Sequence, residues 1–216
     1  MKQSIIRKPL NYSFYNASFY IIGANILMFL ITYISPRALG YLVLNPLAVT
    51  YRNAYWQFIT YMFVHGGISH ILFNMLGLFF FGAQVERRMG STEFVLFYMI
   101  SGVLAGVFSF VVYVTSGATN VYLLGASGAV YAVLLAYATY YPESTIYVMG
   151  IIPVKAPFLV LGFTGLAVFS QVFSFNNGVA HLTHLAGFVI AFIYFLVRLG
   201  INPIDAFFGG GRRRWR

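Results

Sequence analysis

The chain has 216 residues, of which 60% are hydrophobic, only 8% are charged and none is cysteine. Because a soluble domain of this length usually carries about a quarter charged residues, this composition indicates an integral membrane protein. It excludes disulfide bonds and sites built on cysteine thiolates. The formal net charge of +9 does not by itself indicate nucleic-acid binding, since its meaning depends on where the basic residues lie relative to the membrane. The lipid bilayer is therefore an expected partner, whereas neither nucleic acid nor a soluble partner is inferred.

The first 17 residues are basic, and they lack the small-residue cleavage site of a secretory signal. We expect a cytoplasmic segment at residues 1–17, followed by a retained first span at about Ser18–Ile34. A bilayer crossing needs roughly 20 apolar residues, and five later segments approach that length. These further spans are predicted at about Ile68–Val85, Phe94–Val114, Ser127–Tyr141, Ala156–Phe173 and Val179–Leu199. The prediction is an all-α membrane protein with a six-helix domain over residues 18–200 and a basic cytoplasmic tail over residues 201–216.

The segment Ser35–Gly67, between the first two spans, is long and too polar to cross the bilayer. Aromatic residues that suit the water–lipid interface are spread through it, namely Tyr41, Tyr51, Tyr55 and Trp56. We expect this first loop to be partly embedded in one leaflet.

The basic residues predict the orientation of the chain. With six spans both termini lie on one side, and all but two of the 13 lysines and arginines, Arg37 and Arg52, fall on that side. Positive charge marks the cytoplasmic face, so we expect both termini in the cytoplasm and a multi-pass protein of the cell membrane. The tail "GGGRRRWR" is expected to be a flexible spacer with a basic patch that faces anionic lipid.

The acidic residues exclude two kinds of intramembrane protease. All four of them fall at span ends or in loops on the predicted cytoplasmic side: Glu86, Glu93, Glu143 and Asp205. An aspartyl protease needs two aspartates within the spans, and there are none. A zinc metalloprotease of the HExxH type is excluded because no histidine is followed by glutamate.

Histidine, asparagine and serine remain as the polar residues of interest within the spans. They occur in three short stretches, "HGGISHILFN", "LLGASGAVYAV" and "AHLTHLAG", which hold His65, His70, Asn74, Ser127, His181 and His184. Each residue has an ordinary structural explanation in a membrane helix, such as close packing or an interhelical hydrogen bond. The predicted topology, however, places all three stretches at a similar depth near the non-cytoplasmic side. A separate GxxxG pair, Gly102 and Gly106, predicts close helix packing.

The fourth span is about 15 residues long, or roughly 22 Å of helix at 1.5 Å per residue. Because the hydrocarbon core is about 30 Å thick, we expect Ser127 to open this helix below the outer surface, at the floor of a cavity. The first N–H groups of a helix have no internal partner and can donate to an oxyanion. Gly125 and Gly128 remove side-chain bulk around the hydroxyl.

A serine nucleophile needs a base, and the sixth span offers an imidazole. Since no carboxylate lies nearby, the expected arrangement is a dyad of Ser127 and His184, with His70 and Asn74 as donors for the oxyanion. Tyr131, one helical turn after Ser127, is placed to stack on the imidazole ring.

The motifs "HGGISHILFN", "GASG" and "AHLTHLAG", in this order along the chain and on these helices, resemble those of the rhomboid intramembrane serine proteases. The resemblance implies a six-helix bundle with a water-filled cavity, a serine nucleophile at Ser127, a general base at His184 and no cofactor. It assigns the oxyanion site to His70, Asn74 and the Ser127 N–H, and a structural role to His65. Between His181 and His184 it selects the latter, because Gly187 follows three residues on. Substrates would be single-span membrane proteins that approach laterally, past the fifth helix and the loop Ser174–Ala180.

The chain departs from the family pattern at two positions: Gln57 replaces the arginine that often follows Trp56, and Ala191 replaces a glycine. Two other functions compete with the protease. One is a non-catalytic rhomboid-like protein that binds membrane clients, although such relatives typically lack the serine or the histidine. The other is a metal or haem protein that uses the four histidines, which leaves "GASG" unexplained.

Overall fold

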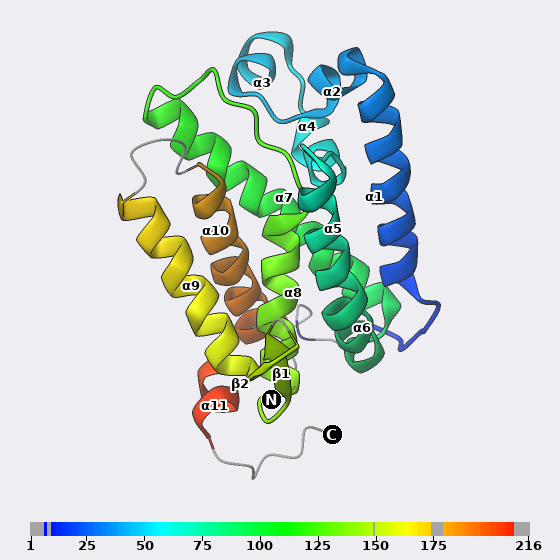
Figure 1. Ribbon diagram of the computed structural model, residues 1–216, viewed down its shortest axis with the longest axis vertical. Coiled ribbons are helices and arrows are strands. Elements are labelled where there is room, and N and C mark those ends of the chain that lie inside the picture. The colour runs from blue at the N-terminus through cyan, green and yellow to red at the C-terminus, as the bar shows by residue number, and fades with distance from the viewer. Residues whose placement is uncertain (1–6, 8–9, 149, 174–178, 210–216) are drawn as a thin grey trace.

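The computed structural model describes residue 7 and residues 10–148, 150–173 and 179–209. Within the helices it does not describe the side chains of residues 167, 170–173 and 179–181. The described chain forms a bundle of helices with one short β-hairpin at one end (Figure 1).

Helices occupy all six predicted positions. They are α1 (Ala17–Ile34), α5 to α6 (Ile68–Gly77, then Leu78–Gly82 and Ala83–Met89), α7 (Ser91–Thr115), α8 (Ser127–Tyr140), α9 (Ala156–Phe173) and α10 (Val179–Tyr194, continued by Phe195–Leu199). Within the described residues, four helices are long and apolar enough to cross a membrane: Ala17–Ile34, Ile68–Met89, Ser91–Thr115 and Leu182–Leu199. The apolar helix Ser127–Tyr140 is shorter, and Ala156–Leu166 is the part of α9 over which the side chains are described without a gap. The chain is therefore a multi-pass integral membrane protein.

The first loop folds into short helical turns, α2 (Pro36–Leu42), α3 (Pro46–Arg52) and α4 (Gln57–Thr60), followed by a 3₁₀ turn at Tyr61–Phe63. Proline at the first position of both α2 and α3 is preorganised for a helix start. Ser35 and Asn45 cap these helices by accepting hydrogen bonds from the backbone N–H groups of Ala38 and Ala48. These signals explain why a segment too polar to cross the membrane still folds compactly.

Gln57 ties the first loop together. Its side chain is buried, its Oε1 accepts from the backbone N–H of Asn45 at 3.0 Å, and its Nε2 donates to the carbonyl of Tyr41 at 3.1 Å. The indole N–H of Trp56 donates to the same carbonyl at 3.0 Å. A neutral amide thus satisfies one donor and one acceptor here, which a guanidinium cannot do because it only donates.

Helix α8 lies in the middle of the bundle and contacts α7, α9 and α10 (Figure 1). Small residues on it let the neighbours approach closely, and they are Gly128, Ala129, Ala132, Ala136 and Ala138, all buried. The closest approach is to α10, where a Cβ on Gly187 would lie only 2.1 Å from the carbonyl oxygen of Gly128. Ala191, one turn further along α10, is fully buried, so its extra methyl group is accommodated.

The sequence predicts that the GxxxG pair on α7 brings two helices close together. In the structure, this pair does more than that. A Cβ on Gly106 would collide with the ring of Tyr61 at 2.7 Å, and a Cβ on Gly102 would collide with Met62. The hydroxyl of Tyr61 donates to the Gly102 carbonyl at 2.6 Å. The two glycines therefore accept side chains from the first loop, and Ala129 of α8 lies 3.3 Å from the position of a Cβ on Gly102.

Two of the four acidic side chains, Glu86 and Glu93, are buried. Glu86 accepts hydrogen bonds from the backbone N–H groups of Ala17 and Ser18, at 2.6 and 2.9 Å, and so caps α1. Glu93, in the first turn of α7, accepts two hydrogen bonds from Arg198 at 2.9 Å each. Both acids lie near helix ends, as predicted, and they join elements that are distant in sequence.

An antiparallel hairpin of β1 (Thr145–Val148) and β2 (Ile152–Lys155) connects α8 to α9, and a short α11 (Pro203–Phe208) follows α10. The prediction of an all-α fold is therefore wrong at this connection. The sequence holds the local signals for a hairpin, since β-branched and aromatic residues flank Gly150, which adopts a φ of 75° in the turn.

Candidate active site

The segment before α8 is held in place by the first loop. Leu44 and Leu123 exchange two backbone hydrogen bonds of 2.9 Å, and the N–H of Gly125 donates to the carbonyl of Tyr61 at 2.9 Å. Because the side chain of Tyr61 is anchored on α7, the chain reaches Ser127, the first residue of α8, along a fixed path. This support could not be predicted, since no pattern in the sequence pairs residue 44 with residue 123.

Gly125 is required by its backbone conformation and by its surroundings. Its φ is 117°, which L-residues rarely adopt. A Cβ at this position would lie 2.6 Å from His70 Nε2 and 3.8 Å from Ser127 Oγ. The absence of a side chain therefore lets the His70 ring reach the neighbourhood of the serine hydroxyl.

Ser127 and His184, which are 57 positions apart, come together across α8 and α10. The distance between His184 Nε2 and Ser127 Oγ is 2.8 Å, and both side chains are half-buried. The close contact of Gly187 with Gly128 makes this possible, because each glycine lies within three residues of one of the two side chains.

Tyr131 fixes the orientation of the imidazole. Its ring stacks on that of His184 with centroids 4.2 Å apart and planes at 12°. Phe163 and Phe188 contact Tyr131 in turn, at 5.9 and 5.0 Å between centroids. The predicted stacking is therefore present, and an aromatic cluster supports the Tyr131 ring.

Thr183 was not singled out from the sequence, yet it supports the same contact. Its methyl group would lie 3.2 Å from a Cβ at Gly128, and its hydroxyl hydrogen-bonds with Ser109 Oγ on α7 at 2.7 Å. A polar residue next to the histidine thus connects three helices, which interhelical hydrogen bonds commonly do in membranes.

His70 and Asn74 lie on one face of α5, toward the serine. The amide Nδ2 of Asn74 donates one hydrogen bond to the carbonyl of His70 at 2.8 Å. Because an amide nitrogen carries two N–H groups, the second can donate to another acceptor. The backbone N–H of Gly66 donates to His70 Nδ1 at 3.4 Å. With Nδ1 acting as an acceptor, the neutral imidazole carries its proton on Nε2, the nitrogen next to Gly125.

His65 lies in the first loop, behind His70. It is buried, and its ring meets the edge of His70 with centroids 5.0 Å apart. Burial, helped by the nearby His70, lowers the pKa of His65 from 6.5 to about 4. His65 is therefore neutral near pH 7, as a packing residue beneath His70 should be. The side chain of the other candidate, His181, lies outside the described residues.

A cavity of about 670 Å³ is lined by both members of the Ser127–His184 pair and by His70 and Asn74. Its polar lining comes from Ser69, His70, Asn74, Ser127, Tyr131 and His184. The rest of the lining is apolar and includes Phe73 and Phe80 from the α5 side and Phe163 from α9. A concave, mostly apolar site with a few convergent polar groups is typical of ligand-binding and catalytic sites.

The described residues contain no group of three or more histidine, cysteine, aspartate or glutamate side chains that could hold a metal ion. Within the described side chains, the histidines instead pair with serine, glycine and aromatic neighbours.

A family model described as "Rhomboid domain" matches residues 52–200, which is more than half of the chain. The chain belongs to the rhomboid family. This family includes serine proteases and acts on transmembrane substrates in the bilayer. The matched region begins within the first loop and runs to the end of α10, so it contains every rhomboid motif that the sequence presents and the whole lining of the cavity.

Proposed function

We propose that this rhomboid is an intramembrane serine endopeptidase that cleaves single-span membrane proteins in or near their transmembrane segment. The observation that carries the proposal is the 2.8 Å contact between Ser127 Oγ and His184 Nε2 inside the cavity. A hydroxyl within hydrogen-bond distance of a basic nitrogen is the arrangement that nucleophilic catalysis requires.

In the acylation step, Ser127 Oγ attacks the scissile carbonyl carbon while its proton passes to His184 Nε2. The tetrahedral intermediate then collapses, the C–N bond breaks, and the imidazolium returns the proton to the leaving amine. Water repeats the sequence on the acyl-enzyme, with His184 again as the base. Tyr131 performs the orienting task that a carboxylate has in a triad, because its ring stacks on the imidazole at 4.2 Å.

The negative charge that develops on the carbonyl oxygen needs donors placed in advance. His70 Nε2–H, the free N–H of the Asn74 amide and the backbone N–H of Ser127 are the proposed donors. The last of these opens α8, where the N–H groups lack helical partners and the helix dipole favours an anion. Removing one such donor typically costs about 10²–10³-fold in kcat.

The proposed topology has six spans, with α8 shorter than both α1 and α9, and both termini in the cytoplasm. The protease domain comprises residues 18–200, flanked by the cytoplasmic segments 1–17 and 201–216. Helix α8 has 14 residues and spans about 21 Å, less than the roughly 30 Å core, which favours a recessed serine. Substrates would approach laterally past α9, where Phe163 lines the cavity; residues 174–178 of the predicted access loop lie outside the described residues.

Cleavage of a single-span reporter in proteoliposomes tests the proposal. Ser127→Ala should abolish cleavage, whereas Ser101→Ala, the same change at a buried serine of α7 whose Oγ has no hydrogen-bond partner in the described structure, should retain it. A serine-directed phosphonate should label the wild-type protein at Ser127. Cleavage that persists in pure Ser127→Ala protein would overturn the mechanism, and a well-folded wild-type protein that neither cleaves nor reacts would favour a non-catalytic, client-binding rhomboid.

A further inference from the structure

The hairpin between α8 and α9 has two chemically different faces. Residues directly opposite each other on antiparallel strands share a face. One face is entirely aliphatic and carries Ile146, Val148, Ile152 and Val154. The other face carries Thr145, Tyr147, Pro153 and Lys155. The hairpin is therefore an amphipathic sheet element.

Protein covers only part of the aliphatic face. At the base of the hairpin, Ile146 packs against the core of the bundle. Val148 and Val154 are half-buried, but toward the turn the cover becomes incomplete, because Ile152 is 56% exposed and its neighbour Ile151 is 79% exposed. Apolar side chains that leave the protein in this way need another apolar environment.

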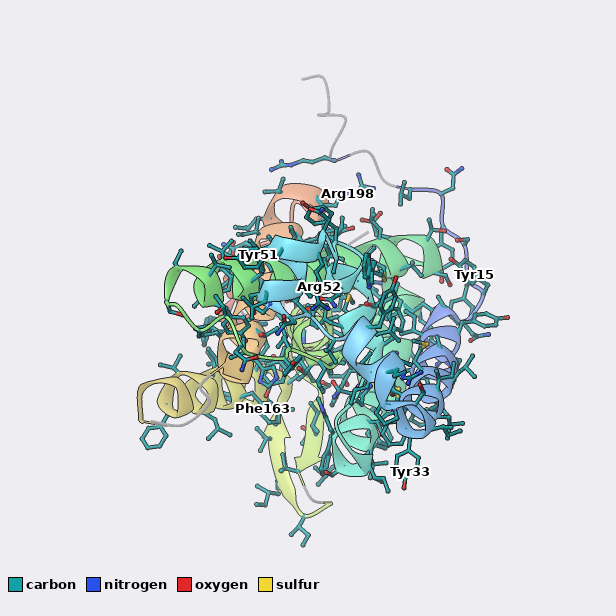
Figure 2. All side chains as sticks on the ribbon, turned by 90° about the horizontal axis from the view of Figure 1, so that it is seen from above. Tyr15, Tyr33, Tyr51, Arg52, Phe163 and Arg198 are labelled. Carbon is teal, nitrogen blue, oxygen red and sulfur yellow. The ribbon has the colours of Figure 1, made fainter. Side chains whose placement is uncertain are left out.

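The direction of the hairpin identifies that environment. It lies near one end of the bundle in Figure 1 and extends sideways beyond the helices, between α9 and α5, in Figure 2. A hairpin with this direction runs roughly parallel to the membrane plane. It does not extend straight out along the bundle axis into water.

The lipid-facing surface of α9 continues directly into the hairpin. Helix α9 begins at Ala156, immediately after β2, and it exposes Phe158 and Leu161 by 60% and 47%. In a membrane protein such side chains face acyl chains. The exposed isoleucines extend this apolar surface past the end of the helix.

The charged groups of the hairpin mark the opposite boundary. Lys155, on the second face, pairs with Glu143 at 2.7 Å, and both side chains are largely exposed. Tyr147, on the same face and 63% exposed, is a residue type enriched at the membrane interface. An apolar face on one side and a hydrated ion pair on the other is the pattern of an element that lies in the interface.

We propose that the β1–β2 hairpin is an interfacial lipid anchor. The exposed part of its aliphatic face at Ile152, together with Ile151, inserts into the acyl-chain boundary of the adjacent leaflet, while Lys155, Glu143 and Thr145 stay at the level of the headgroups and water. This assignment does not depend on protease activity, since it concerns only the depth of the hairpin in the bilayer.

Single-cysteine labelling tests the depth directly, because the native chain has no cysteine. Ile151→Cys and Ile152→Cys would be labelled with an environment-sensitive fluorophore in vesicles of phosphatidylcholine and phosphatidylglycerol. Thr145→Cys, on the other face of the same hairpin, is the matched polar control, and Phe158→Cys on α9 is the lipid-facing control. Thermal unfolding of each labelled variant would establish that it is folded.

The expected result is that Ile151 and Ile152 behave like Phe158. Their labels should emit at shorter wavelength, be quenched by lipids with acyl-chain nitroxides, and respond several-fold less to iodide on both sides of the membrane than the Thr145 label. Iodide quenching equal to that of the Thr145 label would overturn the proposal. Labels shielded from both iodide and nitroxide lipids would also overturn it, because they would show that protein covers this face.

Discussion

The close contact between α8 and α10 can be tested by replacing Gly187 with alanine. The added Cβ would lie 2.1 Å from the carbonyl oxygen of Gly128 and 3.0 Å from its carbonyl carbon. Since real Cβ atoms essentially never come within 3.0 Å of another heavy atom, α10 and α8 would have to separate by about 0.9 Å, the difference between 3.0 and 2.1 Å. The atoms nearest to the added Cβ belong to the backbone of Gly128, so no flexible side chain can move aside.

This separation would lengthen the distance between the two residues of the proposed dyad. His184 lies three residues before Gly187, and Ser127 directly precedes Gly128, so an increase of about 0.9 Å takes their 2.8 Å contact beyond hydrogen-bond reach of about 3.2 Å. A misplacement of about 1 Å costs on the order of 10²-fold in rate. Forcing an extra methyl group into a close-packed core destabilises a protein by about 1–3 kcal/mol. We therefore expect kcat to fall about 100-fold, with a smaller change in KM and a lower Tm.

Two other glycines provide a graded comparison in the same cleavage and thermal unfolding assays. A Cβ on Gly23, in α1, meets nothing within 4 Å, whereas one on Gly128 meets Ala105 and Thr183 at 3.1 and 3.2 Å. Gly23→Ala should behave like the wild type, Gly128→Ala should be intermediate, and Gly187→Ala should be the most damaged. Wild-type kcat and Tm in Gly187→Ala would refute the close contact between α8 and α10. Equal losses in Gly23→Ala and Gly187→Ala would show that the assay reports a general sensitivity to helix substitutions.

Two further predictions concern stability. Glu86→Gln replaces one acceptor oxygen with an NH2 group that faces the backbone N–H donors at the start of α1, so the free energy of unfolding in detergent should fall by about 1–3 kcal/mol. The exposed Glu143→Gln should change it by less than about 1 kcal/mol, and equal effects would contradict the capping role. The pKa of His65 is about 4 in the folded protein against 6.5 when unfolded, so its contribution to stability is present above pH 6.5 and is lost as the pH falls toward 4. His65→Gln should flatten the decline of Tm across that range, since the neighbouring His70 remains in both proteins, and an unchanged decline would contradict the assignment.

The helices were largely predictable from the sequence because lipid exposure imposes long apolar runs whose ends are marked by polar residues. The predicted span Val179–Leu199, for example, has the bounds of α10 and its π-helical continuation. The hairpin was missed because its strands have four residues each and resemble the apolar runs on either side. The first loop was predicted only as an interfacial segment, since its internal order depends on single side chains such as Gln57 that bond to distant backbone groups.

The residues of the candidate site were predictable by type, but not the means by which they meet. Short motifs select Ser127 and His184, yet only the fold brings residues 57 positions apart to 2.8 Å. The structure adds a second requirement that no motif contains: the carbonyl of Tyr61 holds Gly125, while the Tyr61 side chain lies against the glycines of α7. The position of the serine thus depends on the first loop as much as on its own helix. The first loop has too few apolar residues to span the membrane, and its contacts with the segment before α8 fix where that helix begins.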